Sequence, residues 1–587
     1  MTATDTHTET HVDEVDIPAT SRNDDGLYEL VASNDHKMVG RLWIGASILL
    51  LLGLTILGVA NDIERADLDG TGIFGSTSRF FQSWVLFRTG IIFMVVLPLF
   101  IGLATAIVPL QVGSASIAFP RLAAAAFWGW LFASFTHIIS FVADGGLGDV
   151  GEVPRVRTDA TLLTITSFGA MIIAILAASM CIATTIVALR PTGMTLLRVP
   201  TFSWSMLVAT SVWLFSLPVL FANLIFTWVD LQGRPAIEFG TFDTIWARVE
   251  WAWSQPQIYA YAIPVLGIFG EIIPVVAKQR QANRPVLLSF IGVFGALSFG
   301  AWAQTFLSRG ASPEDLAVRQ EFETAFLAAE EGSAERAQLA QRVLDFDDAI
   351  DSRFIYEEFL YIAFGVLIFI VAGLALLGVF DTIRRGSLPK LSGAFLGATV
   401  GAFLLVDAAL VGVIRVIPLW DALHVDNQFL TSNTAQLGLI VAASLAATLG
   451  GLSYWSPKIF GGYAGGAAAM GGVMALLAGG LMLGLSNLIA AFDGQLDITI
   501  SNTAGDLAAT MGIMSVVGSV LLVLGALSMV GTVAPALASS EILPDDPWEG
   551  HTLEWSAPSP PPVGNFVEPI EIVRSPEPLL DEFEEVN

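Results

Sequence analysis

Uncharged apolar segments of about 20 residues recur along the whole chain, and they restrict its fold more than any other feature. A helix needs about that many apolar residues to cross the hydrocarbon core of a bilayer, because it rises only about 1.5 Å per residue. Only 14% of the residues are charged, compared with about 25% in soluble domains, and the mean hydropathy is +0.68. The sequence therefore predicts an all-α membrane protein whose surface contacts the lipid bilayer.

The apolar segments predict about twelve transmembrane helices. They lie at residues 38–60, 89–112, 122–142, 162–189, 202–228, 255–277, 286–307, 359–380, 391–413, 429–452, 465–491 and 507–533. The chain accordingly divides into an acidic tail (1–35), spans one to seven (36–311), a polar insertion (312–352), spans eight to twelve (353–535) and a Pro-rich tail (536–587).

The charged residues predict an orientation and exclude one class of partner. All four lysines, Lys37, Lys278, Lys390 and Lys458, fall on one side of the predicted spans. Basic loops remain in the cytoplasm, so we expect this side and both termini to be cytoplasmic. The net charge of −27 argues against nucleic acid as a partner.

The polar insertion 312–352 holds eleven acidic residues and three arginines. Ser312 and Pro313, followed by two acidic residues, are typical of a helix start. A Gly-Ser pair at 332–333 separates this first helix from a second, which predicts an extramembrane helical hairpin between spans seven and eight. The hairpin is either a solvated insertion or a docking surface for a partner.

Short motifs along the chain resemble those of subunit I of the haem–copper oxidases, and they occur in the same order. They include Asn34-Asp35-His36-Lys37, Ala118-Phe119-Pro120-Arg121, Arg190-Pro191-Thr192-Gly193, Ser216-Leu217-Pro218, Tyr454-Trp455-Ser456-Pro457-Lys458, Asp546-Pro547-Trp548 and Thr552-Leu553-Glu554-Trp555. The resemblance implies the twelve-helix subunit I arrangement in a prokaryotic cytoplasmic membrane. It also implies oxygen reduction with proton pumping, haem and copper cofactors, and association with other subunits of a respiratory oxidase.

The same resemblance indicates which positions would bind the cofactors, and none of them is a histidine here. The former haem-ligand positions are Thr89, Ser432 and Thr434, and the former copper-ligand positions are Gln255, Gln304 and Thr305. In span six the proton-delivering glutamate is replaced by Gln257, while Tyr259 is retained. We interpret these last two residues as relics of the family's catalytic site.

The six histidines of the chain cannot replace the missing ligands. Three are in the tails and His36 precedes the first span, which leaves only His137 and His424 in the membrane region. Copper needs imidazole or thiolate donors, and haem iron needs His, Met, Cys or Tyr. We therefore predict neither haem nor copper; the alternative is that both bind as in the family, through unusual ligands.

Two further groups of residues have alternative interpretations. For His137 we expect a neutral, hydrogen-bonded imidazole rather than a functional group. His424, with Asp421 and Asp426, forms either a weak site for a divalent ion or a solvated loop.

Three functions remain open from the sequence. The chain is a non-catalytic subunit of a respiratory electron-transport complex, an active cytochrome c oxidase subunit I with unusual ligands, or a transporter or quinone-binding protein that reuses the scaffold. The missing ligand histidines favour the first of these.

Overall fold

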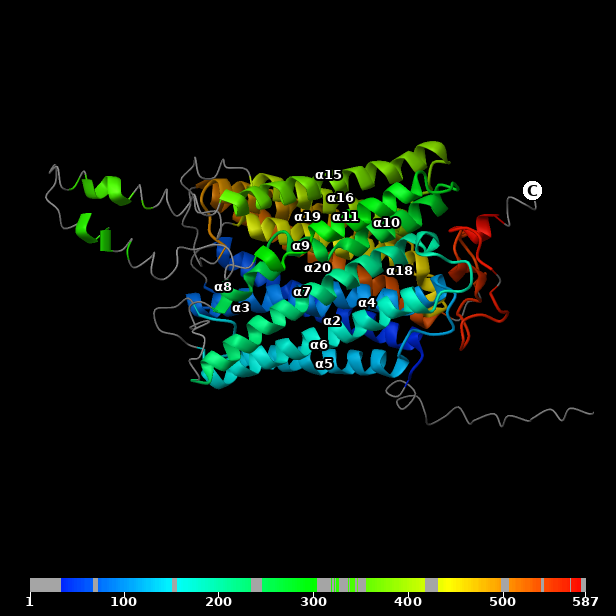
Figure 1. Ribbon diagram of the computed structural model, residues 1–587, viewed down its shortest axis with the longest axis horizontal. Helices are drawn as coiled ribbons and strands as arrows, with labels where there is room; N and C mark the ends of the chain where they lie inside the picture. Colours follow the sequence, from blue (N-terminus) through cyan, green and yellow to red (C-terminus); the bar gives the residue numbers. More distant parts are fainter. Residues whose placement is uncertain are drawn as a thin grey trace, which may run out of the picture. The chain divides into compact units, whose positions relative to one another are not determined.

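The long helices of the described chain run side by side (Figure 1). The structure is a computed structural model. It describes residues 33–66, 72–149, 156–233, 245–303, 355–416, 431–497, 506–539, 543–570 and 572–581, together with scattered helical positions between 318 and 346. The residues from Asn34 onward form one unit.

Twelve helical segments of the described chain are long and apolar enough to cross a membrane, as the sequence predicted. Most are single helices: α2 (His36–Ala66), α5 (Pro120–Val142), α6 (Thr158–Ala188), α7 (Thr201–Leu231), α15 (Ile355–Arg385), α16 (Gly393–Val416), α18 (Ser432–Phe460), α19 (Ala467–Phe492) and α20 (Asp506–Ala538). The other three are composite: span two joins α3 (Thr77–Gly90), η1 (Ile91–Val96) and α4 (Leu97–Gln111); span six joins α9 (Gln257–Ala260) and α10 (Ile263–Val276); span seven joins α11 (Arg284–Leu297) and η4 (Ala301–Ala303).

Span two begins at Thr77, well before the predicted residue 89. The side chain of Ser76 accepts a hydrogen bond from the backbone N–H of Arg79, which caps the helix before its apolar part begins. Hydropathy alone detects only the apolar part of such a helix. As a consequence Arg88, which the sequence placed outside the span, lies within it.

Spans two, six and ten form the centre of the bundle. Their most apolar windows are buried completely or almost completely, whereas the other spans keep one face exposed. A helix that is apolar on all sides is stable only where other helices surround it or where lipid covers it. The residues of the candidate site lie mainly on these central spans and the helices that pack against them.

Small residues allow α16 and α18 to approach closely. Gly393, Gly397 and Gly401 recur every four residues along α16. A side-chain carbon at Gly397 would lie only 2.5 Å from the Cα of Gly450 on α18. Such contacts between small residues stabilise membrane helix pairs through close van der Waals packing.

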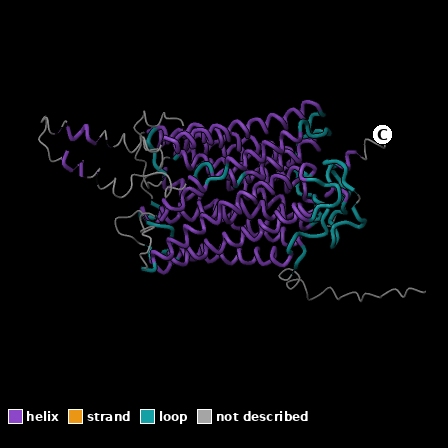
Figure 2. The backbone as a smooth tube through the Cα atoms, viewed as in Figure 1, coloured by secondary structure: helices purple, strands orange, loops and turns teal. Residues whose placement is uncertain are grey.

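The C-terminal tail packs against one end of the bundle, where the loops gather in Figure 2. Asn565 is buried there, and its amide nitrogen donates to the carbonyl of Ser114 at 2.7 Å. Its amide oxygen lies 3.0 Å from Nε2 of His36 and accepts from Nζ of Lys37 at 3.2 Å. The entry motif of span one and the C-terminal motif, more than 500 residues apart, therefore meet at one hydrogen-bonded site.

We expect replacement of Asn565 by alanine to lower the free energy of unfolding by about 1–3 kcal/mol, because it leaves buried polar groups without partners. Thermal and denaturant unfolding in detergent would measure this change, and limited proteolysis would report a loosened tail. Glu568→Ala, an exposed position three residues away, should change stability by no more than about 0.5 kcal/mol. Equal effects of the two substitutions would contradict a specific role for Asn565.

Most of the predicted hairpin at 312–352 lies outside the described residues. Among the described positions, the rings of Phe322 and Phe346 lie 5.7 Å apart in an edge-to-face arrangement. The guanidinium of Arg336 lies 4.8 Å from the centre of the Phe326 ring. A docking role for this segment stays a prediction.

Candidate functional site

Three side chains meet at the position that the resemblance assigns to a copper ligand: Gln255 lies just before span six, Tyr259 lies on α9 of span six, and Gln436 lies on α18. The amide nitrogen of Gln436, on α18, donates to the phenol oxygen of Tyr259 at 2.6 Å and to Oε1 of Gln255 at 3.2 Å. Tyr259 in turn donates to the carbonyl of Ala408 at 3.3 Å. All three side chains are buried. We call Gln255, Tyr259 and Gln436 the amide cluster.

Helix α16, which carries Ala408, supplies further contacts to the amide cluster. The guanidinium of Arg415 donates to Oε1 of Gln436 at 2.7 Å, and Nε2 of Gln255 donates to the carbonyl of Gly412 at 3.3 Å. A side-chain carbon at Gly412 would overlap the phenol oxygen of Tyr259 and lie 2.6 Å from Oε1 of Gln255. The cluster therefore fills its space, and its polar atoms are bonded to one another.

Gln257, at the former proton-delivering position, is fully buried and bonded at both ends of its amide. Its nitrogen donates to the hydroxyl of Ser216 on α7 at 3.0 Å. Its oxygen accepts from the backbone N–H of Gly300 at 2.9 Å. An amide in this arrangement joins spans five, six and seven, and it has no proton to transfer in the way a carboxylic acid has.

His137 contacts the former haem-ligand position of span two. Its two ring nitrogens lie 3.2 Å from the hydroxyl oxygens of Thr89 and Ser167. The ring is fully buried and packs against Phe168, with ring centres 5.6 Å apart. This geometry agrees with the expected hydrogen-bonded imidazole, and it adds a contact with Thr89 that the sequence did not indicate.

Thr434, a former haem-ligand position of span ten, belongs to a buried network of ion pairs. Its hydroxyl donates to Asp497 at 2.8 Å and accepts from Arg88 at 2.7 Å. Arg88 also pairs with Asp497 at 2.7 Å, and Arg65 lies 3.6 Å from the same carboxylate. Arg65 pairs in addition with Asp62 at 2.5 Å. We call Asp62, Arg65, Arg88 and Asp497 the ion-pair network.

Glu250 lies between these two groups of residues, in the short helix η3 (Glu250–Trp253) outside the spans. Burial raises the pKa of Glu250 to about 7, and the positive charges of Arg88 and Arg415 act in the opposite direction. At neutral pH this carboxyl group is therefore divided between its protonated and ionised forms.

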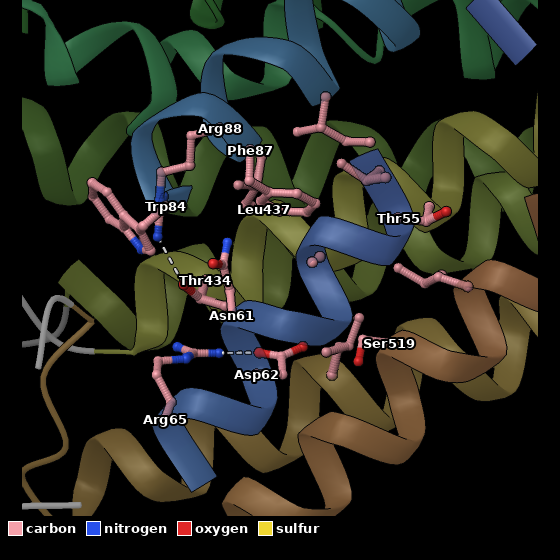
Figure 3. A pocket seen from close by; sticks show the side chains of 16 residues that line it. Thr55, Asn61, Asp62, Arg65, Trp84, Phe87, Arg88, Thr434, Leu437 and Ser519 are labelled. Carbon is pink, nitrogen blue, oxygen red and sulfur yellow. Dashed lines mark hydrogen bonds and ion pairs between the residues drawn. The ribbon is translucent and has the colours of Figure 1, made fainter. Parts of the chain in front are cut away.

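A pocket opens beside the ion-pair network, between α2, α3, α18 and α20 (Figure 3). Its cavity volume is about 50 Å³, which is room for a few water molecules. Thr434, Arg88 and Ile91 line it, so it adjoins both former haem-ligand spans. No His, Met, Cys or Tyr occurs among the described residues that line it.

The residues at these positions do not fit haem or copper. Amide and hydroxyl groups are poor ligands for either metal, and those of Gln255, Thr89 and Thr434 are already hydrogen-bonded within the protein. Ser432 is also buried, but its hydroxyl is not a haem ligand either. Within the described chain, no three His, Cys, Asp or Glu residues lie close enough together to hold a metal ion.

Some predicted site residues cannot be placed. Gln304 and Thr305, the other former copper positions, lie outside the described residues, and so do His424, Asp421 and Asp426. The divalent-ion site at His424 therefore stays a prediction.

The sequence analysis missed several residues of the two clusters. Gln436 follows the polar residues Thr431 to Thr434 at the start of an apolar segment, and Asp497 lies in a loop, so neither carries a motif. Arg88 did have a usable signal, because an arginine close to a long apolar segment suggests a buried charge that needs a partner.

Comparison with known proteins gives matches to subunit 1 of cytochrome c oxidases and quinol oxidases. The family described as "Cytochrome C and Quinol oxidase polypeptide I" matches residues 38–329. Cytochrome c oxidase subunit 1 of Bacillus subtilis (strain 168) is 25% identical over 574 residues, which cover 94% of this chain and 83% of the relative. A putative cytochrome c oxidase subunit 1-beta of Streptomyces avermitilis is 26% identical over 573 residues, which cover 94% of this chain and 92% of the relative. Quinol oxidase subunit 1 of Bacillus subtilis is 28% identical over 297 residues, which cover 48% of this chain and 45% of the relative.

Proposed function

Because the chain is a cytochrome c oxidase subunit I-like member of the haem–copper oxidase superfamily, we propose that it acts as a non-catalytic membrane subunit of a respiratory electron-transport complex. In this proposal it binds neither haem nor copper and resides in a prokaryotic cytoplasmic membrane with both termini in the cytoplasm. Its partners are the other subunits of a respiratory oxidase or a related complex.

The amide cluster carries this proposal. At the former copper position, Gln255 is hydrogen-bonded to Gln436, and Gln436 is hydrogen-bonded to Tyr259 and Arg415. A metal ion would have to break several buried hydrogen bonds and would gain only an amide ligand in return. Buried polar groups that satisfy one another rigidify a helix bundle, which is what a structural subunit requires.

The ion-pair network supports the same proposal at the former haem position. Asp497 and Thr434 hold Arg88 in place, so Thr434 has no free hydroxyl to offer an iron atom. Haem proteins hold the iron through at least one strong axial ligand, and the described pocket lining supplies none.

We expect the purified chain to show no Soret absorption band and to contain no stoichiometric copper, because no described former ligand position carries a suitable donor. Absorption spectra, a pyridine haemochromogen assay and elemental analysis would measure both quantities.

A subunit I that retains six membrane histidines, expressed and purified in the same cells, is the matched control for haem and copper supply. If the control binds its cofactors and this chain also contains one haem per molecule with a bis-imidazole spectrum, the proposal is wrong. Isolation of tagged protein from native membranes, followed by cross-linking and mass spectrometry, should identify other oxidase subunits as its neighbours. An isolated chain without any such neighbour would contradict the structural role.

A further inference from the structure

One acidic side chain lies well inside a membrane span and has no partner within the described chain. Asp407 is on α16, about 13 Å from the nearer end of that helix at a rise of about 1.5 Å per residue. Its Oδ2 atom is buried without a hydrogen-bond partner, and its carboxylate forms no ion pair with the described residues. A carboxylate in a membrane interior is costly unless a donor or a positive charge accompanies it. This side chain therefore indicates a partner from outside the described chain.

The helices around α16 offer this carboxylate no base. Helix α16 packs against α10, α15, α18 and α19. Neither α10 nor α19 contains Lys, Arg or His. The basic residues of α15 and α18 lie in their last turns, at Arg384, Arg385 and Lys458. Arg415, about two turns further along α16, donates to Gln436 on α18.

Asp407 borders a strip of α16 that faces away from the bundle. Phe403 and Leu410 lie one helical turn to either side of it on the same face, and they are 44% and 43% exposed. Asp407 itself is partly exposed. Helix α16 lies next to α15 near one edge of the bundle (Figure 1). The carboxylate can therefore be reached by a helix that approaches through the lipid. We call Phe403, Asp407 and Leu410 the α16 strip.

The depth of this carboxylate restricts the kind of partner. Lipid head groups lie at the bilayer surface and lipid chains carry no donor, so neither brings a positive charge to this depth. A helix of another protein can do so, since polar residues in membranes pair across helix contacts. A second copy of this chain is unsuited, because Arg65, Arg88 and Arg415 are engaged inside its bundle.

We propose that the α16 strip binds a transmembrane helix of another membrane protein, and that this helix carries a lysine or arginine at the depth of Asp407. Phe403 and Leu410 supply the apolar contact, and the ion pair fixes the depth and the rotation of the two helices. The inference adds a docking face to the proposed function, and it rests on that function only in requiring a second membrane protein.

Reconstituted vesicles test the charge preference with defined probes. The full-length protein is placed in phosphatidylcholine vesicles with fluorescent, leucine-rich transmembrane peptides that carry lysine, leucine or aspartate at their centre. Energy transfer between protein and peptide measures their association. We expect the lysine peptide to associate at least tenfold more tightly than the leucine peptide, and the aspartate peptide no more tightly than the leucine peptide. Equal association of the three peptides would overturn the proposal.

Three variants relate this preference to a single carboxylate. Asp407→Leu should abolish the preference for the lysine peptide, and Asp407→Lys should transfer it to the aspartate peptide. Asp506→Asn removes the same charge at an exposed position in the first turn of α20, and it should leave the preference unchanged. The leucine variant keeps the test decisive if the lysine variant fails to insert, because leucine suits a lipid-facing position. A preference for lysine that survives Asp407→Leu contradicts the proposal.

Cross-linking in native membranes identifies the neighbour itself. A photoreactive residue in place of Phe403 should form cross-links to a helix that carries Lys or Arg at matching depth, and Asp407→Leu should abolish them. The same residue in place of Phe215, on α7 and 72% exposed, is the control, since its cross-links should not depend on Asp407.

Cross-links from the Phe403 position only to lipid, to a second copy of this chain or to a helix without a basic residue would show that the proposal is wrong. The proposed function is tested by haem and copper content, which none of these measurements involves. Failure of one is therefore distinguishable from failure of the other.

Discussion

Replacement of Asp497 by alanine is expected to lower the free energy of unfolding by about 3–5 kcal/mol, the usual cost of removing one partner from a buried ion pair. Asp497 is only 2% exposed and contacts both Arg88 and Arg65. Its loss leaves two guanidinium groups with one remaining carboxylate, Asp62. Denaturant unfolding in mixed micelles would measure the change.

The matched control is Asp159→Ala, which breaks an ion pair of similar length at a solvent-exposed position. Arg157 and Asp159 lie 2.8 Å apart, and their side chains are 63% and 74% exposed. Solvent screening makes such a pair worth about 0–1 kcal/mol. If both substitutions cost the same, the ion-pair network does not stabilise the bundle. The double variant Asp497→Ala with Arg88→Met should recover part of the loss, because no charge is then left unpaired at that position.

Replacement of Gly412 by alanine should lower the free energy of unfolding by about 1–3 kcal/mol, the usual cost of overpacking a filled interior. The new methyl group would overlap the phenol oxygen of Tyr259 and lie 2.6 Å and 2.9 Å from Gln255 and Gln436. The amide cluster would have to separate to admit it. The same unfolding experiment measures this change.

Gly373→Ala, the same substitution on α15, is the control. It is expected to raise the free energy of unfolding, whereas Gly412→Ala lowers it. A methyl group there meets no atom within 4 Å, and alanine favours a helix over glycine by about 1 kcal/mol. In a Tyr259→Phe background the cost of Gly412→Ala should fall, since the overlapping oxygen is gone. An unchanged cost in that background would show that the phenol does not limit the space.

In the proposed non-catalytic role, the two clusters explain how the helix bundle remains folded without ligand histidines. Gln255 and Thr434, at positions that the resemblance assigns to metal ligands, are hydrogen-bonded to other polar side chains of the amide cluster and the ion-pair network. Each pairing avoids the cost of an unsatisfied group in a low-dielectric interior. Ser432 differs from these residues, because its buried hydroxyl has no hydrogen-bond partner within the described chain.

The sequence by itself determined the twelve spans, because each depends on a local property, the length of an apolar segment. It also determined that Gln255, Thr89 and Thr434 are not metal-ligand types, since donor chemistry belongs to the side chain. Only the tertiary structure decided which groups contact these side chains. Gln436 meets Tyr259 across 177 residues, and Arg88 meets Asp497 across 409. Such partners are set by how the helices pack, and helix packing brings together residues that no local pattern relates.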